Sequence, residues 1–517
     1  MGNVKIHPIL KEAAGIFNRA GKQAFLVGGA VRDILRGKKA HDWDLATDAR
    51  PEEVMTLFKT VIPTGIKHGT VTILYKGNSL ETTTFRTESD YHDGRRPGRV
   101  EYAAAIEEDL SRRDFTMNAM ALELPGGRLV DPFGGAADVK QGIIRCVGRA
   151  EERFAEDGLR PLRAVRFAAQ LGFTIEEAVL AAVPGALGTT AKVSPERIRN
   201  EMDKILTSPK PSGAFLPMER TGLLALLLPD LAACRGVEQK GYHRFDVLDH
   251  SLLACDYAAA QKFPLPVILA ALFHDIGKPR TRDLKEGVWT FHNHERESAR
   301  LARNILASYR YPNAVTGAAV HLIEEHMFFY EDAWTDAAVR RFIIRIGEEN
   351  LEDLYALRQC DAFGTTGRSP APGLLLPLMN RVETVLAQSR AFSLKDLAVS
   401  GKDLMETGVT PGPGMGIILH ELLEAVVNDP ALNRKEALLE IAANYARTRC
   451  APPGTDTPHR HQIPGAGMFL RRGRCCGKTA AAPPSPAPAT SAAGVIAERR
   501  WFPRRFRLVA DIYPAYY

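Results

Sequence analysis

Two aspartates, Asp42 and Asp44, flank Trp43 in the stretch "KKAHDWDLATDARPEE". In a strand, residues i and i+2 share a face, so the two carboxylates would lie side by side and repel each other. Such repulsion is tolerated at a wet surface, where the pair carries no chemistry, or around divalent cations, which bind hard oxygen ligands and cancel the charge. The neighbouring residues indicate which of the two alternatives, a surface pair or a cation site, applies.

A glycine pair and an arginine precede the aspartates. The stretch "FLVGGAVRD" predicts a short buried strand, a turn at Gly28 and Gly29, and then the start of a helix. Backbone N–H groups of glycines can approach a ligand closely, and a helix N-terminus favours phosphate. Arg32 adds a cation within one turn. A Gly-Gly turn alone is more often structural, but a phosphate cradle, a cation and paired carboxylates together indicate nucleotidyl transfer.

Histidines form a second cluster, because seven of the 14 lie within residues 243–326. The stretch "LFHDIGK" places a histidine beside an aspartate. Imidazole and carboxylate together suit a divalent transition metal or Mg²⁺ with open positions for water. The alternative is a helical domain with hydrogen-bonded core histidines. His274 and Asp275 stand together in "LFHDIGK", with His250 before them and His294, His326 and Asp361 after them.

The elements that must position these residues follow from the hydrophobic pattern. The runs "AFLVGG", "TVTILY" and "SLETTTF" predict strands that alternate with helices, which indicates an α/β domain; from about residue 145 to 449 the pattern is almost wholly helical. The segment "TAAAPPSPAPATSAAG" is low in complexity and predicts a disordered tail. The predicted divisions are a head at 1–140, a helical neck at 141–235, an all-α metal-binding domain at 236–365, a helical region at 366–449 and the tail at 450–517.

Composition narrows the class of protein. The chain has 517 residues and a net charge of +6 from 67 basic and 61 acidic residues, which is weak evidence for a polyanionic partner. Seven scattered cysteines suit a reducing compartment. The N-terminus lacks a signal-peptide core, and no run of 18 apolar residues occurs. We therefore predict a cytoplasmic protein without membrane spans.

Eight motifs, in their order and spacing, carry a resemblance over roughly residues 20–210. They are "LVGGAVRD", "HDWDLAT", "TGIKHGTVTIL", "ETTTFR", "RRDFTMNAMAL", "DPFGGAADVKQGIIRCVG", "RFAEDGLRPLRAVRFAAQLGF" and "SPERIRNEM". The chain resembles the class II CCA-adding tRNA nucleotidyltransferases and bacterial poly(A) polymerases. The resemblance implies an α/β nucleotidyltransferase head followed by an all-α neck and body.

The resemblance also implies roles for individual residues. Asp42 and Asp44 would hold two Mg²⁺ ions, one at the RNA 3′-hydroxyl and one at the triphosphate. Glu81 would be the third acidic residue, its alternative being an exposed strand glutamate. Arg113 and Asp114 would contact the ribose. The nucleotide-binding set implied by the motifs is Gly28, Gly29, Arg32, Arg113, Asp114, Asp157, Arg160, Arg163 and Arg166.

The stretch "EDGLR" bears on the choice of nucleotide. Asp157 and Arg160 stand three positions apart, so we expect them to lie on one helix face and to present an acceptor and a donor together. Such a pair can bind the Watson–Crick edge of CTP or ATP, whereas GTP and UTP reverse that pattern. The alternative is a surface ion pair. From "PERIRNE", Glu196, Arg197 and Arg199 are expected to brace this region or a phosphate.

The histidine cluster resembles the HD phosphohydrolase superfamily. By that resemblance His250, His274, Asp275 and Asp361 are core ligands, and the two further histidines bind a second metal. The implied activity is that of a phosphatase or 2′,3′-cyclic phosphodiesterase, which could repair RNA 3′ ends before nucleotide addition.

Alternatives within the family stay open. Poly(A) polymerases usually carry a "GRRF"-like stretch where His68 and Gly69 stand here, so these two residues favour the tRNA enzymes. The loop with Asp93, Arg95 and Arg96 resembles that of enzymes adding all of CCA rather than CC or A alone. The predicted partners are tRNA, CTP and ATP. An alternative class is a hydrolase whose N-terminal half only binds RNA, although both aspartates argue against it.

Overall fold

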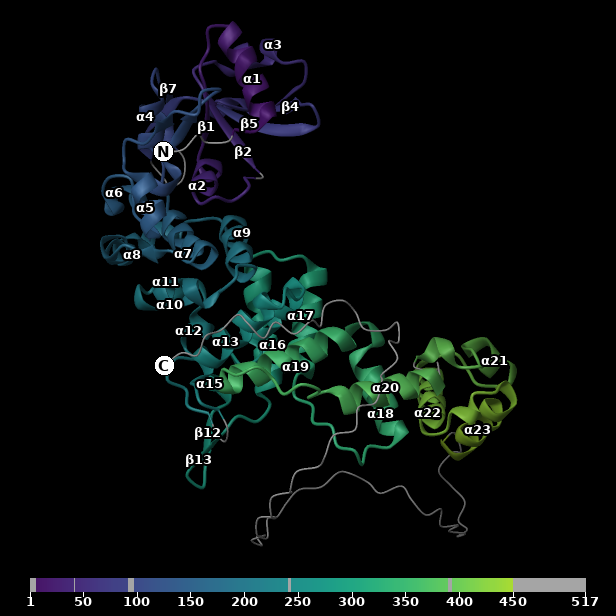
Figure 1. Ribbon diagram of the computed structural model, residues 1–517. Helices are drawn as coiled ribbons and strands as arrows, with labels where there is room; N and C mark the ends of the chain where they lie inside the picture. The colour runs from purple at the N-terminus through teal and green to yellow at the C-terminus, as the bar shows by residue number, and fades with distance from the viewer. Residues whose placement is uncertain (1–5, 41, 92–96, 240–242, 389–392, 450–517) are drawn as a thin grey trace, which may run out of the picture. The chain divides into compact units, whose positions relative to one another are not determined.

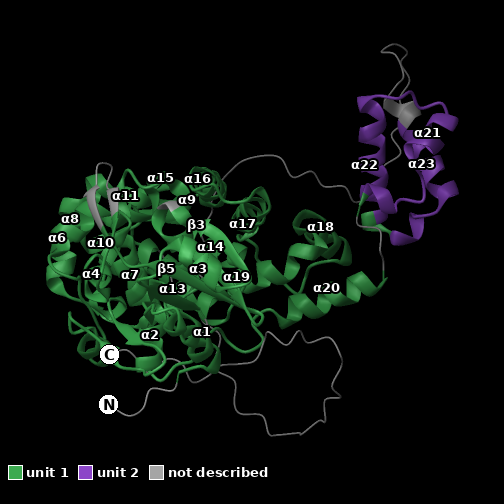
Figure 2. Cartoon of the chain, turned by 90° about the horizontal axis from the view of Figure 1, so that it is seen from above, with its two compact units in different colours: residues 1–393, 427–429 green, residues 394–426, 430–517 purple. Residues whose placement is uncertain are grey.

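The computed structural model describes residues 6–40, 42–91, 97–239, 243–388 and 393–449. The chain divides into two compact units, residues 1–393 with 427–429 and residues 394–426 with 430–517 (Figure 2). The predicted tail at 450–517 lies outside the described residues, as do Asp93, Arg95 and Arg96 of the loop discussed above.

The first unit begins with an α/β head around a mixed seven-stranded sheet (Figure 1). The strand order is β3-β4-β5-β2-β1-β8-β9, with β2 parallel to β5 and the other neighbours antiparallel. The predicted strands are confirmed. The bounds are β1 Ala24–Val27, β2 Trp43–Thr47, β3 Val61–Gly65, β4 Thr70–Tyr75, β5 Asn78–Thr84, β8 Ala121–Glu123 and β9 Leu129–Val130, with a separate hairpin of β6 Arg86–Tyr91 and β7 Pro97–Tyr102.

Helices cover the sheet because their apolar residues recur at helical spacing. In α1 (Pro8–Arg19), Leu10, Ala13, Ala14 and Phe17 form one stripe at i, i+3, i+4 and i+7, and all four are buried. Met117 and Met120 are fully buried in this core. The other head helices are α2 Gly29–Leu35, α3 Pro51–Leu57, α4 Ile106–Ser111 and α5 Gly135–Gln141.

The neck is helical apart from one short strand pair, β10 (Ile143–Ile144) and β11 (Thr174–Ile175), which run parallel. Its core is continuous with that of the head. The neck helices are α6 Ala150–Glu156, α7 Arg160–Leu171, α8 Glu177–Thr190, α9 Pro195–Leu206, α10 Ser212–Arg220, α11 Leu223–Leu227 and α12 Pro229–Ala232.

The remainder of the first unit is a helical bundle in which α13 (Val247–Ala260) and α19 (Leu351–Thr366) pack closely on each other. One hairpin, β12 (Asp283–Lys285) with β13 (Val288–Thr290), interrupts the helical pattern that the sequence predicts here. The other bundle helices are α14 Leu265–Phe273, α15 Lys278–Thr281, α16 His294–Ser308, α17 Asn313–Glu325, α18 Asp336–Ile346 and α20 Leu376–Gln388.

The second unit consists of α21 (Gly401–Glu406), most of α22 (Pro413–Asn428) and α23 (Lys435–Arg449). Ser400 caps α21 by accepting a hydrogen bond from the backbone N–H of Asp403, and Asp403 pairs with Lys435 of α23. In the described part of the chain, no helix is long and apolar enough to cross a membrane.

Candidate functional site

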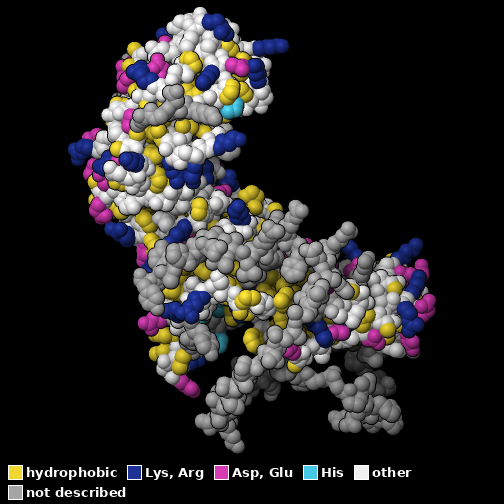
Figure 3. Space-filling view, viewed as in Figure 1, with side chains coloured by type: hydrophobic (Ala, Val, Ile, Leu, Met, Phe, Trp, Pro, Cys, Tyr) yellow, Lys and Arg dark blue, Asp and Glu magenta, His cyan; other side chains and the backbone are white. Residues whose placement is uncertain are grey.

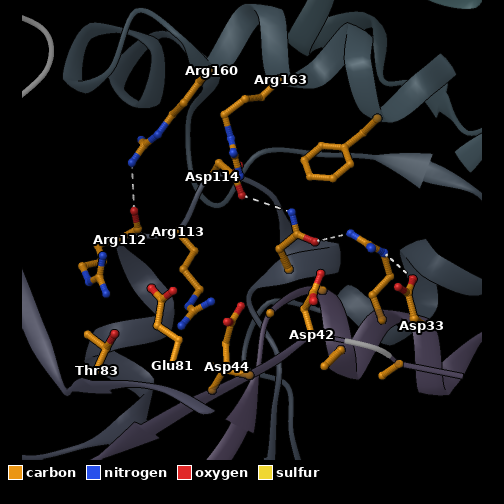
Figure 4. A pocket seen from close by; sticks show the side chains of 18 of the residues that line it. Asp33, Asp42, Asp44, Glu81, Thr83, Arg112, Arg113, Asp114, Arg160 and Arg163 are labelled. Atoms are coloured by element: carbon orange, nitrogen blue, oxygen red, sulfur yellow. Dashed lines mark hydrogen bonds and ion pairs between the residues drawn. The ribbon is translucent and has the colours of Figure 1, made fainter. Parts of the chain in front are cut away.

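A cleft of about 890 Å³ opens between the head sheet and neck helix α7, and its walls carry the residues singled out in the head (Figure 4). Acidic side chains point into it from the sheet, while Arg160 and Arg163 reach toward it from α7. The space-filling view shows Lys and Arg side chains gathered where the head meets the neck (Figure 3). The cleft therefore combines a carboxylate floor with a cationic rim.

The carboxylates converge because β2 and β5 run in parallel. Asp44 and Glu81 are direct register partners on these strands, and Asp42 lines the same cleft. Desolvation within the cleft raises the pKa of Asp44, and the neighbouring charges of Glu81 and Asp42 raise it further. Strand β2 begins only at Trp43, so Asp42 lies in the bend before the strand, which corrects the expectation that both aspartates share one strand face.

The strand, glycine turn and helix predicted from "FLVGGAVRD" are confirmed by β1 and α2. Gly28 has a φ of +70°, a conformation that L side chains rarely adopt. A Cβ there would lie 3.2 Å from the Arg113 guanidinium and 3.7 Å from Oδ2 of Asp44. Glycine is therefore needed both for the turn and for the close approach of these two side chains.

A buried chain of hydrogen bonds joins the head to the neck. Arg32 donates to Oδ1 of Asn118 at 2.9 Å, and Nδ2 of Asn118 donates to Asp114 at 3.3 Å. Arg163 of α7 completes the chain with an ion pair of 2.6 Å to Asp114. Although burial opposes it, the charges of Arg163 and Arg160 hold the pKa of Asp114 below its usual value.

Sequence reasoning missed Asn118 and a second residue, Asp109. Asp109 is 1% exposed and accepts hydrogen bonds from Arg112 at 2.6 Å and Arg113 at 3.1 Å, so it fixes two cleft arginines. Both residues carried a signal, because Asp109 stands three and four positions before the arginines, and Asn118 stands four after Asp114.

Asp157 and Arg160 line the cleft but do not share a helix face, so that prediction is wrong. Asp157 ends α6 in an extended conformation, and Arg160 is the first residue of α7. Oδ2 of Asp157 accepts from Arg197 at 2.7 Å, and Oδ1 accepts from the N–H of Leu159 at 3.0 Å. Arg197 thus braces this carboxylate.

Arg160 is buried and bridges the neck to the head. Its guanidinium pairs with Glu156 at 2.5 Å and donates to the carbonyl oxygens of Arg153 at 2.9 Å and Arg112 at 3.0 Å. Because an arginine has five N–H donors, these bonds leave two of them for a ligand.

Arg166 also lines the cleft, and its guanidinium pairs with Glu201 and donates a hydrogen bond to Gln170. The guanidinium stacks 3.7 Å from the ring centroid of Phe167. Glu196 and Arg199, which lie with Arg197 near the N-terminus of α9, contact Arg310 instead of the cleft.

The candidate metal ligands come together in the helical bundle, and Asp275 lies at their centre. Oδ2 of Asp275 is 3.3 Å from Nε2 of His250 and 3.4 Å from Nε2 of His274. Oδ1 is 3.2 Å from Nε2 of His294 and 3.9 Å from Nε2 of His326. The two oxygens thus face two different histidine pairs.

Asp361 of α19 adds a carboxylate to the first pair, since its Oδ1 lies 3.4 Å from Nε2 of His250 and 3.8 Å from that of His274. Its other oxygen accepts from Arg358 at 2.5 Å. His250 contributes most to holding the pKa of Asp361 well below its usual value against the effect of burial.

Backbone carbonyls fix the orientation of three of the rings. Nδ1–H of His274 donates to Ala271 at 3.0 Å, and His294 and His326 make the same bond, at 2.8 Å and 2.7 Å, to the carbonyl three residues before them. A carbonyl only accepts, so in the neutral ring the proton is on Nδ1 and the lone pair is on Nε2, which faces Asp275. This is the arrangement of metal-ligating histidines.

Two buried atoms at the centre, Nε2 of His294 and Oδ1 of Asp275, lie 3.2 Å apart and have no hydrogen-bond partner among the described residues. A buried polar atom without a partner is costly, so a cation between them fits the site. Gly277 makes the arrangement possible, because a Cβ there would lie 2.7 Å from the carbonyl oxygen of His294. Lys278 donates to Asp275 and to Gln239, both at 2.6 Å.

The remaining clustered histidines differ in environment. His292 is exposed, and Nε2 of His321 donates to the carbonyl of Ile346 at 2.8 Å, which is a structural bond. The ring of His243 lies 5.2 Å from that of His250, and burial lowers the pKa of His243 to about 4.

Three family descriptions match successive parts of the chain. "Poly A polymerase head domain" matches residues 24–145, "Probable RNA and SrmB- binding site of polymerase A" matches 172–235, and "tRNA nucleotidyltransferase domain 2 putative" matches 284–442. The first covers the head sheet and its carboxylates. The third covers three of the six candidate metal ligands.

Curated relatives match over most of their length. The CCA-adding enzyme of Lactiplantibacillus plantarum is 36% identical over 83% of this chain and 94% of its own, and that of Geobacillus stearothermophilus is 36% identical over 86% and 98%. The solved Bacillus stearothermophilus CCA-adding enzyme in complex with CTP has a TM-score of 0.65 at 32% identity, covering 86% of this chain and 99% of that one. The chain therefore belongs to the CCA-adding enzyme family of tRNA nucleotidyltransferases.

Proposed function

We propose that the head cleft adds CMP and AMP to the 3′ end of tRNA. The observation that carries this proposal is the pairing of Asp44 with Glu81 across β2 and β5, beneath a rim of arginines. Phosphoryl and nucleotidyl transfer depend mainly on positioning and on charge neutralisation, and both kinds of group face the same cleft. Family membership supports tRNA as the acceptor.

The acidic residues fit Mg²⁺. Burial raises the pKa of Asp44, and the charges of Glu81 and Asp42 raise it further; a cation bound by these three residues would relieve that repulsion. When bound, the metal supplies Lewis-acid chemistry at the 3′-hydroxyl and the triphosphate. Around it, the arginines hold the phosphates, and Arg113, fixed by Asp109, lies over Gly28 and beside Asp44.

Base selection falls to Asp157 and Arg160. A carboxylate with two bonds already made can still accept from an exocyclic amino group, and Arg160 retains two donors for the adjacent ring nitrogen. CTP and ATP offer this pattern, while UTP and GTP reverse it. The pair therefore acts as a template although its two members stand on successive helices.

The test is incubation of the purified protein with tRNA lacking its 3′ end, Mg²⁺ and each nucleoside triphosphate in turn. CMP should be added first and AMP only after it, and Asp44→Ala should slow addition by about a thousandfold or more, because loss of one such charge stabiliser costs several kcal/mol. Addition of A alone, of C alone or of a poly(A) tail would identify another member of the family. Full activity in the variant would rule out the assignment of Asp44.

A second function is favoured by the histidine cluster. The lone pairs directed at Asp275 and the two unpartnered buried atoms support a centre for one or two divalent cations, of transition-metal type or Mg²⁺, held by His250, His274, Asp275, Asp361, His294 and His326. Such a bound cation lowers the pKa of a water molecule. We therefore assign the part of the bundle at residues 236–365 a phosphoesterase activity on 2′,3′-cyclic or 2′-phosphate ends.

Its test is the metal content of the protein, followed by hydrolysis of a 2′,3′-cyclic phosphate. His274→Ala combined with Asp275→Ala should remove both while leaving nucleotide addition within a few-fold, because distant independent sites rarely couple. If the wild-type protein retains no metal and hydrolyses no ester, the cluster is structural. If the folded double variant loses nucleotide addition, the two-site account is wrong.

A further inference from the structure

The segment that follows ligand His326 displays two apolar side chains to solvent. Phe329 is 73% exposed and Met327 is 59% exposed, the two highest values among the large hydrophobic residues that the structure describes. Single exposed hydrophobic residues are common at protein surfaces. This pair, however, directly follows a candidate metal ligand, on a segment that its neighbours hold in place.

Their neighbours hold the segment firmly. The backbone N–H of Phe328 donates to the carbonyl of His326 at 3.1 Å, so the chain turns directly after the ligand. The ring of Phe328 packs 5.3 Å from that of Phe342, and Tyr330 packs 5.4 Å from Trp334. Residues 328 and 330 are thus anchored, and the residue between them is directed away from this aromatic packing.

The exposed ring lies within reach of the metal centre. Consecutive Cα atoms are 3.8 Å apart, so the Cα of Phe329 is at most about 11 Å from that of His326. This is comparable with the size of one nucleotide. The Phe329 side chain therefore starts no farther from the ligand His326 than about the length of one nucleotide, which is the span between a phosphoester held at Asp275 and its own base.

Cations lie at the phosphate end of this arrangement. Lys278 contacts one oxygen of Asp275, and Arg358 contacts one oxygen of Asp361. An exposed aromatic ring combined with cations beside a backbone phosphate is how proteins bind single-stranded nucleic acid, because every base has a face that can stack. A small phosphoester without a base would have no aromatic face to stack on the Phe329 ring.

We infer that Phe329 is a stacking platform for the terminal base of an RNA strand whose 3′-terminal phosphoester occupies the metal centre. This inference rests on the proposed phosphoesterase. It names the substrate class, which is an RNA 3′ end rather than a base-free phosphoester. The ring contacts the base and leaves the hydrolytic step itself to the metal ligands.

The test uses the full-length, metal-loaded protein and two cyclic phosphodiesters. One is an RNA oligonucleotide that ends in a 2′,3′-cyclic phosphate and carries 2-aminopurine as its terminal base; the other is glycerol 1,2-cyclic phosphate, which lacks a base. Phe329→Ala should raise KM for the RNA about tenfold or more, the usual size of a stacking contact, while glycerol cyclic phosphate hydrolysis stays within twofold. Phe329→Trp should restore the RNA KM.

A second readout does not depend on turnover. Binding should quench 2-aminopurine fluorescence before the first hydrolysis, and Phe329→Ala should remove that quenching with no change in metal content. Leu216→Ala is the matched control, because Leu216 is also an exposed apolar residue, at 43%, but belongs to α10.

Each other outcome overturns the inference in a recognisable way. An unchanged RNA KM and unchanged quenching in Phe329→Ala would show that the base stacks elsewhere, while the metal centre would stand. An equal loss of hydrolysis of the RNA and of glycerol cyclic phosphate in Phe329→Ala would show that Phe329 has only a structural role. A wild-type protein without metal that hydrolyses neither ester would remove the phosphoesterase itself, and this inference with it.

Discussion

Replacing Arg197 should relax the choice of base without weakening the hold on the triphosphate. Its Nη2 lies 2.7 Å from Oδ2 of Asp157, and within the described part of the chain that carboxylate accepts one other bond, from the N–H of Leu159. A hydrogen bond to a charged group contributes about 1.5–3 kcal/mol. Both side chains are about a quarter exposed, at 26% and 20%, so we take the lower part of that range, about 1.5–2 kcal/mol.

That energy corresponds to a loss of about 10- to 30-fold in discrimination between CTP and UTP, as an upper limit. The assay is kcat/KM for each nucleotide on tRNA lacking its 3′ end, in Arg197→Ala and in the control Arg199→Ala. Arg199 stands on the same helix but contacts Arg310 outside the cleft. The control should match the wild type.

A double-mutant cycle separates a brace from a phosphate ligand. If Arg197 acts only through Asp157, Asp157→Ala with Arg197→Ala should discriminate no worse than Asp157→Ala alone, because the two residues form one unit. Equal falls in kcat/KM for CTP and UTP, or additive effects in the cycle, would mean that Arg197 holds the triphosphate and would refute the reasoning.

Three further predictions concern the supports of the sites. Gly28→Ala should cost more than about 1 kcal/mol of unfolding free energy and reduce nucleotide addition, because its φ of +70° is strained for alanine; Gly126→Ala, with open space around it, is the control in thermal unfolding. Asn118→Ala should raise KM for both nucleotides, because the bridge between the head and the neck breaks; an unchanged KM would contradict this. Burial raises the pKa of Asp256 to about 6 from 3.8, so its contribution to stability is complete below about pH 4 and is lost as the pH rises through 6. The free energy of unfolding should therefore fall by about 3 kcal/mol between pH 4 and pH 7, as measured by denaturant unfolding. Asp256→Asn keeps an acceptor for Ser212 and should remove most of this fall. An equal dependence on pH in both proteins would contradict the assignment.

Sequence reasoning predicted the strands and the glycine turn because each is encoded locally, by apolar runs and by Gly28. It placed Glu81 on a later strand but could not show that this residue lies opposite Asp44. That adjacency depends on the parallel pairing of β2 with β5, which are separated by two other strands in the chain. Long-range register has no local signal of this kind.

The prediction that Asp157 and Arg160 share one helix face was wrong for a reason that is visible in the sequence. Gly158 interrupts the helix, and a Cβ there would lie 2.5 Å from the carbonyl oxygen of Thr189. Pro161 stands in the first turn of α7, a position that marks a helix start. Read together, these two residues predict two helices joined by a turn, rather than one continuous face.

The resemblance in the order of histidines and aspartates selected the six candidate ligands, and the structure brings all six together. The division of Asp275 between two histidine pairs was not predictable, because it depends on how α13, α14, α16 and α17 pack. Their metal-binding role stays a prediction, as does the division of the chain into five parts.

The most direct measurement of the central claim is the sequence of the product. The wild-type protein is incubated with tRNA lacking its last three nucleotides and with all four nucleoside triphosphates at equal concentration, and the new 3′ ends are sequenced. If side chains in the cleft select the base, the added sequence should be CCA, without U or G, and addition should stop there. A homopolymer, or frequent incorporation of U, would contradict the account.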